Sequence, residues 1–246
     1  MNMAVDEAIL KARIENAVPN TIRLYRWSPS AVSIGRFQEV DKEAQTENCR
    51  KHGVDIVRRI SGGGSVYHDA EDEITYSMII GKADLGTQDI GKVYQKIYSG
   101  LAEALKNLGV NADFNPGDAK TCPNLTVNGR KISGSAQAHR RGVALQHGTI
   151  LSRVDLVKMF TFLRVPWAST CMQVVKIAEN KITSIFNETG RNVSECEIVN
   201  AFVNGFEKTF KIELEADRLT AKELEAAENL RREKYAAERW NFSGRN

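Results

Sequence analysis

The chain has 246 residues, 42% of them hydrophobic, which is enough for the core of one large domain or two small ones. Its 34 basic and 31 acidic residues leave a net charge of +3, too small a surplus for a dedicated nucleic-acid-binding protein. The sequence shows no export signal, no apolar run of membrane-spanning length and no C-x-x-C pair among its four cysteines, so we expect a cytoplasmic protein that binds neither a membrane nor a cysteine-based zinc ion.

Hydrophobic spacing predicts the following elements in the first half of the chain. They are a helix over residues 3–15, strands over 22–27 and 31–34, a polar helix over 39–52, strands over 54–57 and 74–80, and an amphipathic helix over 90–108.

The second half is predicted in the same way. A loop over 111–123 precedes a hairpin centred on residues 128–129, a strand over 143–151 and a helix over 154–163. Further along we expect a helix over 194–210, an alternating segment over 211–214 and a long charged helix over 220–239. Because strands come in adjacent groups, the order predicts an α+β fold with a mixed, largely antiparallel sheet flanked by helices.

Residues 58–69 read Arg-Arg-Ile-Ser-Gly-Gly-Gly-Ser-Val-Tyr-His-Asp and are the most informative segment. Three consecutive glycines let a ligand approach the backbone, and consecutive N–H groups in such a loop can converge on an anion. Arg58 and Arg59 directly precede the glycines and could bind the same anion. The alternative is a flexible hairpin turn, which needs neither three glycines nor an arginine pair.

A second segment, residues 127–137, predicts a strand, an Asn-Gly turn and a second strand. After the turn, Lys131 is followed by the small residues 133–136, so one cation stands beside open space. The next strand contains His147-Gly148, again a polar side chain beside a bare backbone position. We therefore expect a ligand site that the glycine loop and these strands share.

These segments resemble the lipoate–protein ligase and lipoyl/octanoyl transferase family, and residues 1–8, 33–38 and 234–241 resemble other parts of it in the expected order. The resemblance implies an α+β fold of the class II aminoacyl-tRNA synthetase and biotin-ligase type. It also implies a single catalytic domain over residues 1–246, without the C-terminal accessory domain of larger ligases.

Our first interpretation is a lipoate–protein ligase that converts lipoate and ATP to lipoyl-AMP and transfers the lipoyl group to a carrier lysine. By resemblance Lys131 would be catalytic, polarising the acyl carbonyl and screening the phosphate. His68 and Asp69 would shape the loop, and Asp118 and Asn124 are candidate Mg²⁺ ligands. The implied residues for ATP and lipoyl-AMP are Arg59, Gly62, Gly63, Gly64, Ser65, Val66, Tyr67, Lys131, Gly134, Ser135, Ala136, His147 and Gly148.

Two alternatives stay open. An octanoyl or lipoyl transferase would hold the acyl group on Cys122, upstream of Lys131, as a thioester and would need no ATP. Against it, residues 123–125 look like the ligase's Asn-Asp-Leu segment, and a loop cysteine is most often a small apolar filler. The other alternative is a non-catalytic lipoyl-binding protein, against which Arg59 and Lys131 argue.

The resemblance also implies protein partners. These are lipoyl carrier domains, namely the E2 subunits of 2-oxoacid dehydrogenases and the H protein of glycine cleavage. Because the sequence stops shortly after Trp240, we expect a separate accessory polypeptide to assist adenylation.

Overall fold

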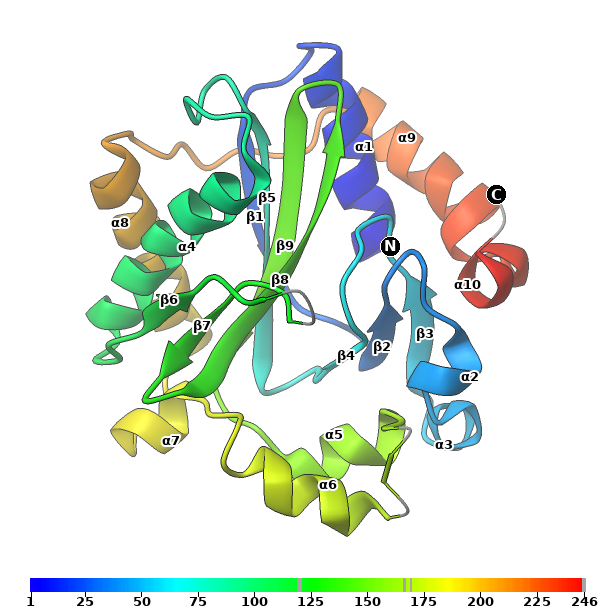
Figure 1. The fold of residues 1–246 in the computed structure, drawn as a ribbon. Coiled ribbons are helices and arrows are strands. Elements are labelled where there is room, and N and C mark those ends of the chain that lie inside the picture. The colour runs from blue at the N-terminus through cyan, green and yellow to red at the C-terminus, as the bar shows by residue number, and fades with distance from the viewer. Residues whose placement is uncertain (119–120, 166, 169, 245–246) are drawn as a thin grey trace.

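The computed structural model describes residues 1–118, 121–165, 167–168 and 170–244 and contains a larger and a smaller sheet (Figure 1). Every neighbouring pair in the larger sheet is antiparallel. Its strand order is β1 (Thr21–Tyr25), β5 (Glu73–Gly81), β9 (Val143–Leu151), β8 (Arg130–Arg140), β7 (Asn124–Val127) and β6 (Asp113–Asn115).

Helices cover both faces of this sheet, because alternate strand residues point to opposite sides. On one face Tyr76 and Met78 pack with α4 (Ile90–Asn107) and α8 (Glu195–Phe210). On the other face Ile79 and Leu145 pack with α1 (Asn2–Ile14) and α9 (Ala221–Leu230). Figure 1 shows the two helix pairs on either side of β5 and β9. The central strands β5 and β9 are therefore buried on both faces.

The smaller sheet has the order β3 (Asp55–Arg58), β2 (Ala31–Ile34), β4 (Val66–His68), with a parallel β2–β3 pair and an antiparallel β2–β4 pair. Its own core includes Val32, Tyr67 and Phe162. Helices α2 (Val40–Glu43), α3 (Thr46–Lys51) and α5 (Leu156–Phe162) contribute to this core, and α6 (Cys171–Ala178) packs on α5. Helix α7 (Ile185–Thr189) instead adds Ile185 to the core of the larger sheet. The glycine loop, residues 61–65, connects β3 to β4.

The predicted α+β class and the largely antiparallel sheet are confirmed. The helix predicted over 39–52 is instead split, since Ala44 is extended and pairs with Leu163. The loop predicted over 111–123 contains the edge strand β6, whereas 211–214 forms no strand. The split of 39–52 and the edge strand β6 both depend on pairing with another segment of the chain, which hydrophobic spacing does not report.

The long helix predicted over 220–239 begins as expected, with a capping box between Thr220 and Glu223. It gives way to a π-helical turn, η1 (Arg231–Tyr235), and ends before α10 (Glu238–Ser243). The break lets Tyr235 and Trp240 both be buried, with their rings edge to face at a centroid distance of 6.1 Å. No helix in the described ranges is long and apolar enough to cross a membrane.

The C-terminal helix holds the strand that leads into the glycine loop. Arg58, 2% exposed, donates from Nε to the Trp240 carbonyl at 2.9 Å and from Nη1 to the Gln38 carbonyl at 2.6 Å. The Trp240 indole N–H donates in return to the Arg58 carbonyl at 2.9 Å. Arg58 thus links its own strand, β3, to the backbone at Trp240 and at Gln38.

Candidate active site

A pocket opens where the glycine loop meets the larger sheet, and it brings together most of the residues predicted for the site. Its walls come from β1, β2, β4, β5, β8, β9, the glycine loop and the segment before β7. The predicted site residues that line it are Arg59, Gly63, Gly64, Ser65, Val66, Cys122, Lys131, Gly134, Ser135, Ala136, His147 and Gly148. Two of the residues predicted for ATP and lipoyl-AMP do not line this pocket: Gly62, whose carbonyl accepts from Arg59, and Tyr67, which stacks on Phe162 and lines a neighbouring pocket.

Arg59 is buried in the loop and uses all five of its N–H groups on the protein. Nη2 donates to the carbonyls of Gly62 at 3.0 Å and Gly64 at 2.8 Å. Nη1 donates to the carbonyl and the hydroxyl of Ser33 at 2.9 and 2.8 Å, and Nε donates to Ser61 Oγ at 3.3 Å. Burial lowers the pKa of Arg59 to about 10, which leaves it charged at neutral pH. Arg59 therefore acts first as a clamp on the loop.

The clamp leaves the loop N–H groups unused. Among the described residues, no acceptor is found for the backbone N–H groups of Gly63, Gly64 and Ser65. Gly63 has φ +84°, in the left-handed region that favours glycine. A loop whose carbonyls are held and whose N–H groups are free can bind an oxyanion.

Lys131 is the second residue of β8, and its head lies against the backbone of Gly134. A Cβ on Gly134 would be 2.4 Å from Lys131 Nζ, so only glycine leaves room for the lysine head in this position. Although Lys131 keeps an exposed surface, burial among pocket atoms lowers the pKa of its ammonium, opposed by negative charge at Cys122 and reinforced by Arg59. The small residues after Lys131 in the sequence therefore make space for it.

Cys122 lines the same pocket and stands just before β7. A Cβ on Gly63 would be 3.9 Å from Cys122 Sγ and 3.6 Å from Arg59 Nη2, so the sulfur lies beside the glycine loop. The thiol is free and exposed. A thiol near an arginine and a lysine is in the electropositive surroundings typical of a nucleophilic cysteine.

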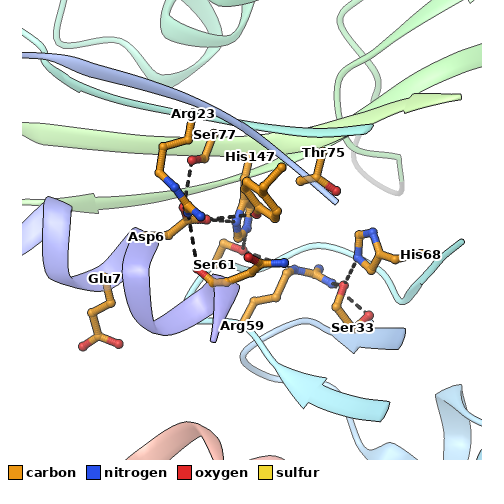
Figure 2. A network of polar contacts seen from close by, with 12 residues as sticks. Asp6, Glu7, Arg23, Ser33, Arg59, Ser61, His68, Thr75, Ser77 and His147 are labelled. Carbon is orange, nitrogen blue, oxygen red and sulfur yellow. Dashed lines mark hydrogen bonds and ion pairs between the residues drawn. The ribbon is translucent and has the colours of Figure 1, made fainter. Parts of the chain in front are cut away.

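His147 is buried beneath the pocket in a polar network that starts at α1 (Figure 2). Its Nδ1 lies 3.3 Å from Asp6 Oδ2, and its Nε2 lies 2.6 Å from Ser61 Oγ. Burial would raise the pKa of Asp6, but the Arg23 guanidinium and the contact with His147 hold it below the ordinary value. Burial lowers the pKa of His147 despite Asp6, and Arg59 adds to that shift. His147 is therefore neutral at neutral pH.

His68 has the same kind of surroundings on the other side of Arg59. Its Nε2 is 2.7 Å from Ser33 Oγ, and its Nδ1 is 2.7 Å from Glu73 Oε1. The ring stacks on Trp27 with a centroid distance of 4.3 Å. The expectation that His68 shapes the loop agrees with these contacts, whereas Asp69 accepts from Tyr67 and pairs with Lys158.

The two candidate magnesium ligands do not line the pocket. Asp118 closes a turn with Thr121, and Asn124 donates from its side chain to the Cys122 carbonyl at 3.0 Å. Within the described residues, no three His, Cys, Asp or Glu side chains form a cluster that could hold a metal ion. The arrangement gives no support to a magnesium site on these two residues.

Sequence analysis missed the supports of the two histidines, namely Asp6, Arg23, Ser33, Glu73 and Thr75. One signal was present: Asp6 lies among Met3, Val5 and Ile9 on a helix predicted to be buried, and a buried carboxylate needs partners. Nothing in the sequence named those partners, because they come from strands far along the chain.

The model for the lipoyl protein ligase A/B catalytic domain family matches residues 1–207. The chain belongs to this family. It is therefore an acyl-transferring enzyme, and that coarse part of the prediction is confirmed.

Among the curated relatives is octanoyltransferase LipM of Anoxybacillus flavithermus, 37% identical, with 98% of this chain and 93% of the relative covered. The LipM of Bacillus subtilis is 35% identical at the same coverage. Solved structures include a bipartite lipoate protein ligase of Thermoplasma acidophilum, with TM-score 0.84 and 29% identity over 100% of this chain and 92% of that one. Lipoate-protein ligase A bound with ATP has TM-score 0.83 and 27% identity, covering 99% and 93%.

These relatives correct our first interpretation. An ATP-dependent lipoate–protein ligase was predicted, yet these and two further relatives, 35–37% identical over nearly the whole chain, are octanoyltransferases. ATP and Mg²⁺, expected as cofactors of the ligase reaction, have no support from them. The error came from residues 123–125, whose likeness to the ligase segment outweighed Cys122 directly before them.

Proposed function

We propose that this protein is an octanoyltransferase that carries the acyl group on Cys122 as a thioester and passes it to a lysine of a lipoyl carrier domain. The observation that carries the proposal is the position of the Cys122 thiol, in one pocket with Lys131, Arg59 and the free N–H groups of the glycine loop. The octanoyltransferase relatives support the same acyl group.

In the first step the Cys122 thiolate attacks the carbonyl carbon of an octanoyl thioester donor. A C–S bond forms, the carbonyl oxygen becomes an oxyanion, and the donor thiolate then leaves. The N–H groups of Gly63 to Ser65 and the Lys131 ammonium are the donors available for that oxyanion. Exchange between thioesters is nearly balanced in energy, so this step requires no ATP.

In the second step the neutral amine of the carrier lysine attacks the acyl-enzyme. The amide bond forms, the Cys122 thiolate leaves, and the amine loses a proton. In the first step the Lys131 ammonium gives its proton to the leaving donor thiolate, and the neutral Lys131 then accepts the proton of the carrier amine, which restores the ammonium beside the Cys122 thiolate. Lys131 can thus stabilise charge in the first step and shuttle a proton in the second.

The test follows the mass of the intact enzyme after mixing with an octanoyl-loaded acyl carrier protein and no ATP. We expect one octanoyl group on the wild-type protein, its loss on addition of a lipoyl domain, and an octanoylated lysine on that domain. Cys122→Ser should form no stable adduct and lose at least about 10³-fold in transfer, since a hydroxyl is a far weaker nucleophile.

The matched control is Cys196→Ser. Cys196 is also exposed, but it lies in α8, outside the pocket. It should behave as wild type. Transfer by Cys122→Ser at a near-normal rate, or a wild-type enzyme that modifies the carrier only with ATP, would rule out the proposed route.

A further inference from the structure

Two serine–histidine–carboxylate rows end on the same arginine, and neither has a part in the transfer steps. One row is Ser61, His147 and Asp6 (Figure 2). The other row is Ser33, His68 and Glu73. They come from different elements of the fold, yet both start at a hydroxyl that accepts a hydrogen bond from Arg59. The repetition around one guanidinium is the observation to explain.

The direction of every hydrogen bond follows from Arg59, which can only donate. Ser61 Oγ accepts from Arg59 Nε, and Ser33 Oγ accepts from Arg59 Nη1. Each hydroxyl has one hydrogen, and the partner in range is the Nε2 atom of its histidine, at 2.6 Å for Ser61 and 2.7 Å for Ser33. That hydrogen has Nε2 as its acceptor when the ring carries its own proton on Nδ1.

An ionised carboxylate can only accept, so the Nδ1 atom that faces it carries a proton and donates. His147 Nδ1 donates to Asp6, and His68 Nδ1 donates to Glu73. Asp6 is in turn held by Arg23, Ser77 and Tyr25. Both carboxylates can only accept when ionised, so each row runs in one direction from guanidinium to carboxylate.

We propose that His147 and His68 are positioning residues that hold the Arg59 guanidinium through Ser61 and Ser33, and thereby set the conformation of the glycine loop. Arg59 has two N–H groups committed to the loop carbonyls of Gly62 and Gly64. The two rows fix its other donors, so the guanidinium cannot rotate and release those carbonyls. The inference rests on the proposed function only where it concerns the rate of acyl transfer.

Both histidines also line the pocket, so contact with the acyl chain has to be separated from action through Arg59. Ser61 makes the separation possible, because it is 1% exposed and does not line the pocket. If His147 acts through Ser61, then Ser61→Ala and His147→Leu remove the same effect, and the double variant is no slower than the slower single variant. Contact with the acyl chain would make the two losses multiply.

The experiment has two independent readouts. Nitrogen-15 spectra of histidine-labelled protein at neutral pH report the tautomer, with His147→Gln and His68→Gln assigning the signals. We expect both rings to carry the proton on Nδ1. A proton on Nε2 in either ring would overturn the proposal for that row, whether or not the protein proves to be an octanoyltransferase.

The second readout is the rate of Cys122 acylation. A glutamine oxygen can replace Nε2 as the acceptor for the serine, whereas leucine cannot. We expect His147→Leu and His68→Leu to be slower by on the order of 10- to 100-fold. The glutamine variants should recover at least about tenfold of that loss, and His52→Gln, on the surface, should match wild type. Equal acylation rates for the glutamine and leucine variants of a histidine would contradict the proposed role. So would a double variant, Ser61→Ala with His147→Leu, whose loss in rate is the product of the two single losses.

Discussion

The head of Lys131 and the bare backbone of Gly134 form one unit at the residue scale. Gly134→Ala would put a Cβ 2.4 Å from both Cε and Nζ of Lys131, and no other atom meets that Cβ closer than 3.9 Å. Because the far end of a lysine is flexible, the ammonium should move by about 1 Å or more while the strand stays intact. Such a misplacement costs on the order of 10- to 100-fold in rate.

Acylation and transfer rates, together with the melting temperature, check this prediction. The melting temperature of Gly134→Ala should change little, and Gly91→Ala in α4 serves as a control with both rates unchanged. Normal rates in Gly134→Ala would mean that the exact place of the Lys131 ammonium does not matter.

The lowered pKa of buried His147 has a consequence for stability. The groups that act on it are Asp6, Arg59 and His68. The unfolded chain takes up a proton on His147 around pH 6.5, whereas the folded chain takes it up only at a lower pH. The contribution of His147 to the free energy of unfolding is therefore complete above pH 6.5 and declines as the pH falls. The decline is at most about 1.4 kcal/mol per pH unit.

Urea unfolding between pH 7 and 5 measures that decline. His147→Gln cannot take up the proton, so its stability should fall less steeply over this range than that of wild type. An identical slope in both proteins would show that His147 keeps an ordinary pKa in the folded state.

At the scale of elements, α10 anchors β3 and hence one end of the glycine loop. Trp240 is 1% exposed and gives its indole N–H to the Arg58 carbonyl. Trp240→Ala should lower the free energy of unfolding by about 3–5 kcal/mol, the usual cost of removing a buried aromatic side chain. Trp240→Phe keeps most of the ring and should lose less.

Denaturant titrations of the three proteins provide the measurement. A loss below about 1 kcal/mol in Trp240→Ala would mean that α10 is only loosely attached, and that Arg58 is held by its other carbonyl partners alone.

The same arginine pair shows where sequence reasoning succeeded and where it stopped. The glycine loop, Lys131 and His147 were placed in one site because their residue types need open space, a cation or a bare backbone. Arg58 and Arg59 were assigned to an anion, yet both turn inward to backbone carbonyls and serine hydroxyls. Their acceptors include residues as far apart in sequence as Ser33 and Phe242, and no local pattern reports contacts of such separation.

At the scale of the whole molecule, the active pocket lies where the two sheets meet. β4 and the glycine loop provide one wall, and β8 and β9 the other. The α+β class followed from the grouping of strands, whereas the division into two sheets did not, because strand pairing depends on partners that are distant in sequence. The splitting of residues 39–52 has the same origin, whereas the break in 220–239 comes from the burial of Tyr235 and Trp240.

Acylation of Cys122 should tie these walls together. The backbone N–H groups of Gly63, Gly64 and Ser65 have no acceptor among the described residues, so in the free enzyme they exchange hydrogen readily. An octanoyl thioester offers a carbonyl oxygen to them and an apolar chain to the pocket, and a group bound only to the folded state stabilises it. We expect hydrogen exchange of residues 61–66 to slow by at least about tenfold in the acyl-enzyme.

Cys122→Ser treated with the same donor should show no slowing, and neither should α8, which lies outside the pocket. Unchanged exchange in the loop of a fully acylated enzyme would exclude the loop as the oxyanion site, and Lys131 would remain the candidate donor.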